Sequence, residues 1–294
     1  MANRLSPISN PKVILITGCS SGFGLLTASR LAAHGHTVIA TMRNLGKRQA
    51  LLDETRERDT NLQILPLDVT DTKSIKMTVT AVEAQHGRID VLVNNAGYGI
   101  GGFFEDLTQE EIRAQLDTNF FGLQNVTREV IPIMRRQRQG KIINISSIAG
   151  LYALPSFGAY NASKWALEGF SESLYYEMKL FGINVCLIEP GTYRTTIFFE
   201  NKRYAKNFNN PQSPYYKYSK YFSEAVDKYV AADKKNPEDI AILVEKVVNT
   251  KNPSFRNIPN IQSKILWTLR RLLPFRVFSG ILYRLLFWRM SKKM

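Results

Sequence analysis

The amino-acid sequence predicts an α/β fold, a doubly wound parallel sheet in a single domain, on three observations. Six apolar runs of strand length recur along the chain, at residues 12–17, 36–42, 62–67, 89–93, 141–145 and 183–188. Helix-length segments separate these runs, for example at 24–34, 72–86, 109–134 and 160–181. Such an alternation is typical of a parallel sheet that helices cover on both faces. A chain of 294 residues with 44% hydrophobic side chains can bury one core without a disulfide or a metal.

Charge and cysteine content exclude several classes of protein. The net charge is +14, but the segment from Lys264 to the C-terminus holds eight basic residues and no acidic one, which leaves +6 elsewhere. A mildly basic body argues against a nucleic-acid-binding fold. Cys19 and Cys186 lack the spacing of a disulfide or zinc site, and the three histidines do not cluster. We therefore expect no metal, no signal peptide, and a cytoplasmic protein, with membrane-surface association as the alternative.

A glycine-rich turn follows the first predicted strand, where Thr17-Gly-Cys-Ser-Ser-Gly-Phe-Gly24 leads into a helix. Glycines let backbone amides approach a phosphate closely, and the start of the helix adds partial positive charge. The alternative is a tight strand–helix corner that binds nothing. Its place between a strand and a helix favours a nucleotide site, whose candidate contacts are Gly18, Ser20, Ser21, Gly22, Phe23 and Gly24.

The end of the second predicted strand bears on which nucleotide binds. An NAD site normally has an acidic residue there, which accepts a hydrogen bond from the ribose 2′-hydroxyl. This strand ends in Ala40-Thr-Met-Arg43, without an acid. The Arg43 guanidinium can hold a 2′-phosphate through charge-assisted hydrogen bonds. Unless Arg43 is simply a solvent-exposed loop residue, the sequence favours NADP(H) over NAD(H).

A tyrosine and a lysine stand four residues apart in Tyr160-Asn-Ala-Ser-Lys164, so they share one face of a predicted helix. Ser147 follows the strand at 141–145, at the carboxyl end of the sheet, where open α/β sheets bind ligands. A neighbouring ammonium favours the ionised phenol and thereby suits it to proton transfer. Taken alone, a Tyr-x-x-x-Lys spacing is more often an ordinary pair of helix residues.

The motifs together are more specific than each alone. In chain order they are the turn at 17–24, Asn94-Asn-Ala-Gly97, Asn119, Ser147, Tyr160-x-x-x-Lys164 and Pro190-Gly191. Over residues 10–200 the chain closely resembles the short-chain dehydrogenase/reductase family of the classical type, which implies a Rossmann-type sheet. The glycine-rich turn and the sequence Ala-Thr-Met-Arg are similar to those of the 17β-hydroxysteroid and retinol dehydrogenase branch.

The resemblance implies four catalytic residues. Tyr160 would be the acid in carbonyl reduction and the base in alcohol oxidation. Lys164 would lower the pKa of Tyr160 and bind the nicotinamide ribose. Ser147 would hydrogen-bond the substrate oxygen, and Asn119 would help hold a water that links Lys164 to solvent.

The resemblance also implies a cofactor site and an activity. Further cofactor contacts would be Asp68 and Val69 at the adenine, Asn95, Ala96 and Gly97 beneath the cofactor, and Pro190, Gly191, Thr192 and Thr195 at the nicotinamide and pyrophosphate. We expect an NADP(H)-dependent oxidoreductase that acts on a hydrophobic alcohol or carbonyl compound, steroid-like, retinoid-like or long-chain. The alternatives are an NAD-dependent alcohol dehydrogenase and a non-catalytic nucleotide-sensing or membrane-associated scaffold. A homodimer or homotetramer is expected from the family.

Two segments lie outside this core of residues 10–192. Residues 193–235 are expected to form a substrate lid, with an irregular loop at 211–221, and they are rich in aromatics, including Phe198, Phe199, Tyr204, Phe208, Tyr215, Tyr218 and Phe222. These rings either line a site for a hydrophobic substrate or pack the lid onto the body.

Residues 261–294 are expected to form a basic, amphipathic C-terminal extension. Two helical apolar stripes are predicted, Ile265, Leu269, Leu272 and Leu273 before Pro274, then Phe278, Ile281, Leu282 and Leu285 after it. The apolar stripes and flanking basic residues suit a helix lying on an anionic membrane surface. The alternative is that the stripes cap the substrate pocket or form a dimer contact.

Overall fold

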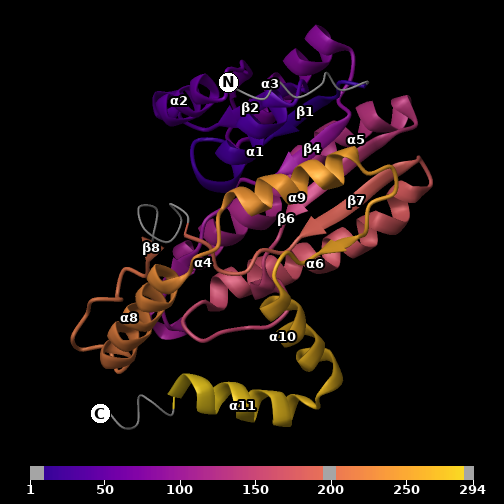
Figure 1. The fold of residues 1–294 in the computed structure, drawn as a ribbon. Helices are drawn as coiled ribbons and strands as arrows, with labels where there is room; N and C mark the ends of the chain where they lie inside the picture. The colour runs from indigo at the N-terminus through magenta and orange to yellow at the C-terminus, as the bar shows by residue number, and fades with distance from the viewer. Residues whose placement is uncertain (1–9, 195–202, 288–294) are drawn as a thin grey trace.

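The computed structural model describes residues 10–194 and 203–287. A parallel sheet of seven strands runs through the molecule in the order β3-β2-β1-β4-β6-β7-β9 (Figure 1). Its strands are β1 (Val13–Ile16), β2 (Thr37–Met42), β3 (Gln63–Pro66), β4 (Val91–Asn94), β6 (Gly140–Ile145), β7 (Ile183–Ile188) and β9 (Arg256–Asn257). The predicted doubly wound sheet is therefore confirmed. The seventh strand, β9, was not predicted, because two residues make no apolar run.

Helices cover both faces of the sheet. One layer consists of α1 (Gly22–Ala33), α2 (Gln49–Glu57) and α9 (Glu238–Asn249), and the other of α3 (Thr72–His86), α5 (Gly122–Gln137) and α6 (Gly158–Lys179). Successive strand residues point to opposite faces. In β1, Ile14 and Ile16 pack beneath α1 and α9, whereas Val13 and Leu15 pack beneath α3, α5 and α6.

The helix predicted at 109–134 is divided in the structure. It begins as α4 (Gln109–Leu116), capped by Thr108 and Glu111 through reciprocal side-chain hydrogen bonds. A π-helical turn, η3 (Asp117–Phe121), then separates α4 from α5. Such turns are often found at functional sites, and this one contains Asn119.

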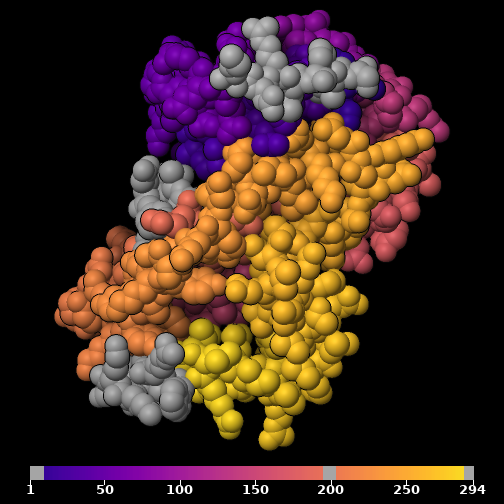
Figure 2. Space-filling view, viewed as in Figure 1, coloured from indigo at the N-terminus to yellow at the C-terminus, as the bar shows by residue number. Residues whose placement is uncertain are grey.

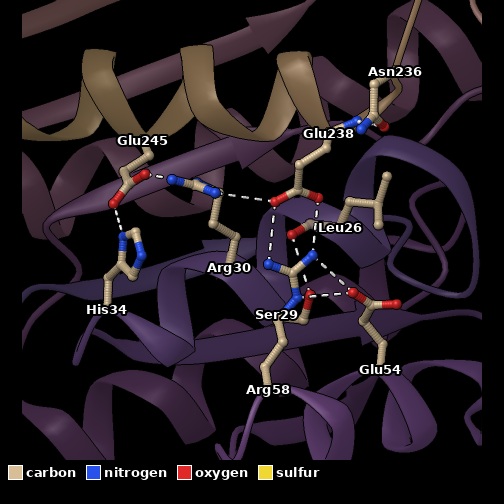
Figure 3. Close-up of polar contacts among 9 residues, drawn as sticks. All are labelled: Leu26, Ser29, Arg30, His34, Glu54, Arg58, Asn236, Glu238 and Glu245. Carbon is tan, nitrogen blue, oxygen red and sulfur yellow. Dashed lines mark hydrogen bonds and ion pairs between the residues drawn. The ribbon is translucent and has the colours of Figure 1, made fainter. Parts of the chain in front are cut away.

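Ion pairs fasten α9 to α1 and α2 (Figure 3). The Glu238 carboxylate accepts hydrogen bonds from Arg58 at 2.9 and 3.1 Å and from Arg30 at 3.1 Å. Arg30 also donates to Glu245 at 2.7 Å, and the ring of His34 contacts the same carboxylate. These groups are partly buried, so solvent screens them less than exposed pairs.

The segment predicted to form the lid and the C-terminal helices lie at the end of the molecule away from α2 (Figures 1 and 2). Within the described residues the predicted lid contains β8 (Arg203–Tyr204), paired with β5 (Ile100–Gly101), and the helix α8 (Tyr216–Ala232). The irregular loop predicted at 211–221 therefore ends earlier, where α8 begins. The extension forms α10 (Ile261–Leu272) and α11 (Phe275–Phe287), on either side of Pro274. In the described ranges, no helix is long and apolar enough to span a membrane.

Candidate active site

A cleft of about 700 Å³ opens at the carboxyl ends of β1, β2 and β4. Among the residues that line it are Gly18, Ser20, Ser21, Gly22, Phe23, Arg43, Asp68, Val69, Asn95, Ala96 and Gly97. All of them were candidate cofactor contacts in the sequence. Gly24 and the pair Pro190-Gly191 do not line the cleft, and neither does Thr192. Thr195 lies outside the described residues, as do Phe198 and Phe199.

Two glycines allow the turn after β1 to pack against the turn after β4. Gly18 has φ +73°, and a Cβ there would lie 2.7 Å from Cα of Ala96. A Cβ on Gly24 would collide with the side-chain amide of Asn95. That amide donates hydrogen bonds to the carbonyl oxygens of Thr17 and Gly18, at 2.9 and 3.0 Å. Gly24 therefore supports the cleft by packing against Asn95 and Gly18.

The residues that line the cleft fit a dinucleotide in their charges. The N-terminus of α1 faces it through the lining residues Gly22 and Phe23, so the helix dipole favours a phosphate there. At the other side, Arg43 is 68% exposed and lies 3.9 Å from the Asp68 carboxylate. Lys47, in the short 3₁₀ turn η1 (Leu45–Lys47), also lines the cleft and brings a second cation near Arg43. Lys47 was not predicted as a cofactor contact, although it is the next basic residue after Arg43.

The Ser147, Tyr160 and Lys164 side chains meet beside this cleft. Ser147 caps the 3₁₀ turn η4 (Ile148–Gly150), just after β6, and the neighbouring Ser147 hydroxyl acts to lower the pKa of the Tyr160 phenol. Lys164 lies one helical turn after Tyr160 on α6, with Nζ 5.8 Å from the centre of the Tyr160 ring. Nζ donates a hydrogen bond of 2.8 Å to the carbonyl oxygen of Ile145. The end of β6 and the start of α6 thus bring a hydroxyl, a phenol and an amine together.

Burial dominates the acid–base properties of these groups. It raises the pKa of the Tyr160 phenol, and the hydrogen bond with Ser147 opposes this rise. Burial lowers the pKa of Lys164 to about 8, and the neighbouring Glu168 carboxylate opposes the fall. The groups of the protein therefore keep the phenol protonated near pH 7, which is the form that can donate a proton.

Asn119 connects the cleft to α6, the helix that carries Tyr160 and Lys164. Its side-chain oxygen accepts a hydrogen bond of 3.0 Å from the amide of Tyr98, and its Nδ2 donates to the Tyr98 carbonyl at 2.8 Å. Nδ2 also lies 3.2 Å from the Ser163 hydroxyl on α6. Tyr98 lines the cleft, and the next residue, Gly99, packs on the Tyr160 ring. This end of the cleft therefore borders Ser147, Tyr160 and Lys164, which do not themselves line it.

A buried ionic cluster lies next to Lys164. Glu168, one turn after Lys164 on α6, accepts hydrogen bonds from the Ser146 hydroxyl and from Arg256 of β9. Arg256 also donates to Glu189 at 2.5 Å. Burial and the charge of Glu168 raise the pKa of Glu189 to about 8. The cluster links Lys164 to Pro190, the residue after Glu189, whose carbonyl oxygen lies 3.5 Å from the Ser147 hydroxyl.

Several aromatic residues of the predicted lid pack on Phe103 of the body or on one another. Phe103 stacks on Tyr215 with ring centres 4.8 Å apart, and it meets Phe222 of α8 edge-on at 5.8 Å. Tyr204 stacks on Phe208 at 4.0 Å. These contacts agree with the packing interpretation for these rings. One lid residue reaches the cofactor cleft, because the Arg203 guanidinium lies 4.1 Å above the Tyr98 ring and lines the cleft.

Comparison with known proteins places the chain in a family. The short chain dehydrogenase family model matches residues 12–206. A 3-ketodihydrosphingosine reductase of Bacteroides thetaiotaomicron is 41% identical over 84% of this chain and 87% of that protein. The human retinol dehydrogenase 8 is 37% identical over 88% of this chain and 85% of that protein.

Solved structures agree with this assignment. A short-chain dehydrogenase/reductase of Burkholderia phymatum in complex with NAD has a TM-score of 0.78 at 26% identity, over 89% of this chain and 93% of that one. A metagenomic short-chain oxidoreductase in complex with NADP has a TM-score of 0.66 at 27% identity, over 85% and 98%. Related structures thus hold both nucleotides. With a matched family model and relatives above 30% identity across most of its length, this chain belongs to the short-chain dehydrogenase/reductase family, oxidoreductases of alcohol and ketone groups.

Proposed function

We propose that the protein is an NADP(H)-dependent oxidoreductase that transfers hydride between the nicotinamide and a hydrophobic alcohol or carbonyl compound. The observation that carries the proposal is the meeting of Ser147, Tyr160 and Lys164 at the end of a cleft that fits a dinucleotide. The family membership also leads us to expect a homodimer or homotetramer.

The proposed roles follow from the positions of the side chains. NADPH, when bound, supplies the hydride. The Tyr160 phenol donates a proton to the carbonyl oxygen of the substrate, and the Ser147 hydroxyl hydrogen-bonds the same oxygen. Lys164, with a pKa of about 8, is mostly protonated near pH 7 and stabilises negative charge that develops on the phenol. Asn119 fixes Tyr98 and Ser163 on either side of these groups.

The preference for NADP(H) rests on the cations at the end of β2. Arg43 and Lys47 both line the cleft, and neither Met42 nor Arg43 offers a carboxylate for a ribose 2′-hydroxyl. Asp68 is the acid nearest to Arg43, and it belongs to the loop after β3, where the family binds adenine. A 2′-phosphate between Arg43 and Lys47 would gain charge-assisted hydrogen bonds.

Two features support a hydrophobic substrate. The segment after Ser147 packs against the apolar side chains of α10 and α11 through Ile148, Leu151 and Tyr152. Two relatives are named for 3-ketodihydrosphingosine and retinol. Since the relative named for 3-ketodihydrosphingosine is 41% identical over most of the chain, we place a long-chain ketone first.

The test is NADPH consumption with 3-ketodihydrosphingosine, all-trans-retinal and a 17-ketosteroid, each with the wild type and with Tyr160→Phe. We expect turnover of at least one carbonyl compound, and a fall in kcat by a factor of about 10² to 10⁴ in the variant, because the proton donor is lost. The matched control is Tyr176→Phe, an exposed tyrosine on the same helix, which should leave kcat unchanged.

Two results would contradict the proposal. Tight NADPH binding without turnover of any of the three compounds would favour the non-catalytic nucleotide-binding alternative. Turnover that survives in Tyr160→Phe would remove Tyr160 from the role of proton donor.

A further inference from the structure

The outer surfaces of α10 and α11 are unusually apolar. Nine large apolar side chains on these two helices are at least 42% exposed: Ile261, Ile265, Leu269, Leu272, Phe275, Val277, Ile281, Tyr283 and Leu285. Ile261, Ile265 and Leu269 follow one another at intervals of four residues, so they form one stripe along α10. Val277, Ile281 and Leu285 repeat the pattern on α11 and form a second stripe.

The inner surfaces of the same helices are already occupied. The inner side of these helices packs against the segment after Ser147. The side chains that do so are Leu266 and Trp267 of α10, Leu273 just after it, and Phe278 and Leu282 of α11. Each stripe predicted from the sequence is thus divided, because its inner members cover the body and its outer members remain exposed. The exposed set, which we call the outer apolar stripes, is not needed to close the core.

Basic side chains flank the outer apolar stripes. Lys264, Arg271, Arg276 and Arg284 are exposed, and within the described part of the chain none of them forms an ion pair with an acidic side chain. The sequence after Glu245 contains no Asp or Glu. Long basic side chains beside an apolar stripe can lay their methylene groups on it and extend their charges outward. The surface therefore combines exposed hydrocarbon with uncompensated positive charge.

We propose that α10 and α11 dock on an anionic membrane surface, with the outer apolar stripes in the headgroup region and the four basic residues at the lipid phosphates. Charge complementarity selects this partner. A symmetric dimer through the same face would place each set of cations against its copy, because a twofold interface pairs a patch with itself. An anionic bilayer instead supplies both the apolar layer and the opposite charge.

The position of α10 and α11 indicates a function for the membrane contact. The amide of Gly191 lies 3.4 Å from the side-chain oxygen of Asn260, the residue before α10, so this helix starts at the loop that follows β7. At the other end, Phe287 of α11 meets Phe222 of the lid helix with ring centres 5.3 Å apart. The helices that carry the outer apolar stripes therefore border both the loop after β7, which lies next to Ser147, and the predicted lid, where a lipid-soluble substrate would enter. This delivery role rests on the proposed function, whereas the membrane contact does not.

The test is flotation of the full-length protein with vesicles of phosphatidylcholine, with and without phosphatidylglycerol, in the absence of substrate. We expect the wild type to bind the anionic vesicles and to lose binding as NaCl rises from about 0.05 M to about 0.5 M, because salt screens the charges. The variant Lys264→Gln, Arg271→Gln, Arg276→Gln, Arg284→Gln should bind anionic vesicles at least about tenfold more weakly. A second variant, Ile261→Ser, Ile265→Ser, Leu269→Ser, should weaken binding to both vesicle types.

The matched control changes the same net charge elsewhere, as Lys73→Gln, Lys76→Gln, Lys246→Gln, Lys251→Gln, on exposed side chains of the body. It should bind as the wild type does. Equal losses in the control and the tail variant would overturn the proposal, as would binding that no variant changes. The proposal would also be overturned if gel filtration showed that the wild type is a dimer and that the serine substitutions dissociate this dimer, and if the wild type did not bind vesicles. Melting temperature shows whether each variant is folded, and vesicle binding without turnover would separate failure of the proposed function from failure of the docking surface.

Discussion

Two helical regions of this protein place their basic side chains in opposite surroundings. Around α9, Arg30 and Arg58 are held by Glu238 at 2.9 to 3.1 Å, and Arg30 also by Glu245 (Figure 3). On α10 and α11, Arg270 and Arg271 lie over aromatic rings instead, and no described residue of the two helices pairs with a carboxylate. The basic side chains of the first region are paired with carboxylates of the same molecule, whereas those of the second region can pair with the acidic groups of a binding partner.

The same contrast holds for apolar side chains. Five residues of α9, Ile240, Ala241, Val244, Val247 and Val248, are buried in the core with α1. On α10 and α11, Phe278 is the fully buried apolar side chain among the described residues, and the nine of the outer surface are exposed. A helix such as α9, whose apolar side chains apart from the exposed Ile242 are mostly covered by the body, contributes to stability. A helix that contacts the body on one side only leaves its other side available to bind a partner.

Arg43 lies in a third environment, since it is exposed like the basic residues of α10 and α11 but lines the cleft. Arg43→Asp should raise the Kd for NADPH by about ten- to a hundredfold and leave that for NADH nearly unchanged, because a 2′-phosphate loses its charge-assisted hydrogen bonds. Fluorescence titration with both nucleotides measures this. Arg48→Asp, an exposed arginine outside the cleft, is the control. Equal effects on the two nucleotides would remove Arg43 from the phosphate site.

Glu238→Gln tests whether the paired charges stabilise the fold. The change removes the ionic partner of Arg30 and Arg58, and it should lower the free energy of unfolding by about 1–2 kcal/mol. Urea denaturation measures the effect. Glu57→Gln is the control, because Glu57 is an exposed acid of α2 without an ion pair in the described structure. A loss no larger than that of the control would mean that the ion pairs around α9 contribute little to stability.

Much of the fold could be predicted from local patterns. The six apolar strands and the glycine turn are encoded in short stretches, because a buried strand must be apolar throughout. The helix α9 also carried a readable signal, with apolar residues at Ile240, Val244 and Val247, although the sequence analysis did not use it. The break at η3 and the strand β9 were not predictable, since each depends on contacts with distant segments.

The site divides in the same way. Ser147, Tyr160 and Lys164 could be proposed from the sequence because their motifs are local and their order is specific. The ionic cluster of Glu168, Glu189 and Arg256 joins α6, the end of β7 and β9, so no stretch of sequence contains it. Likewise, the sequence shows that the C-terminal stripes are apolar, but only the packing shows which side of each helix the body covers.

The most direct measurement compares kcat/KM for the best long-chain carbonyl substrate in anionic vesicles and in a soluble cyclodextrin complex. The wild type and the tail variant, in which Lys264, Arg271, Arg276 and Arg284 are changed to glutamine, are assayed in parallel. If the body carries the chemistry and the two C-terminal helices deliver the substrate, the variant loses activity in vesicles and keeps it in cyclodextrin. An equal loss, or no loss, in the two presentations would contradict this division of roles.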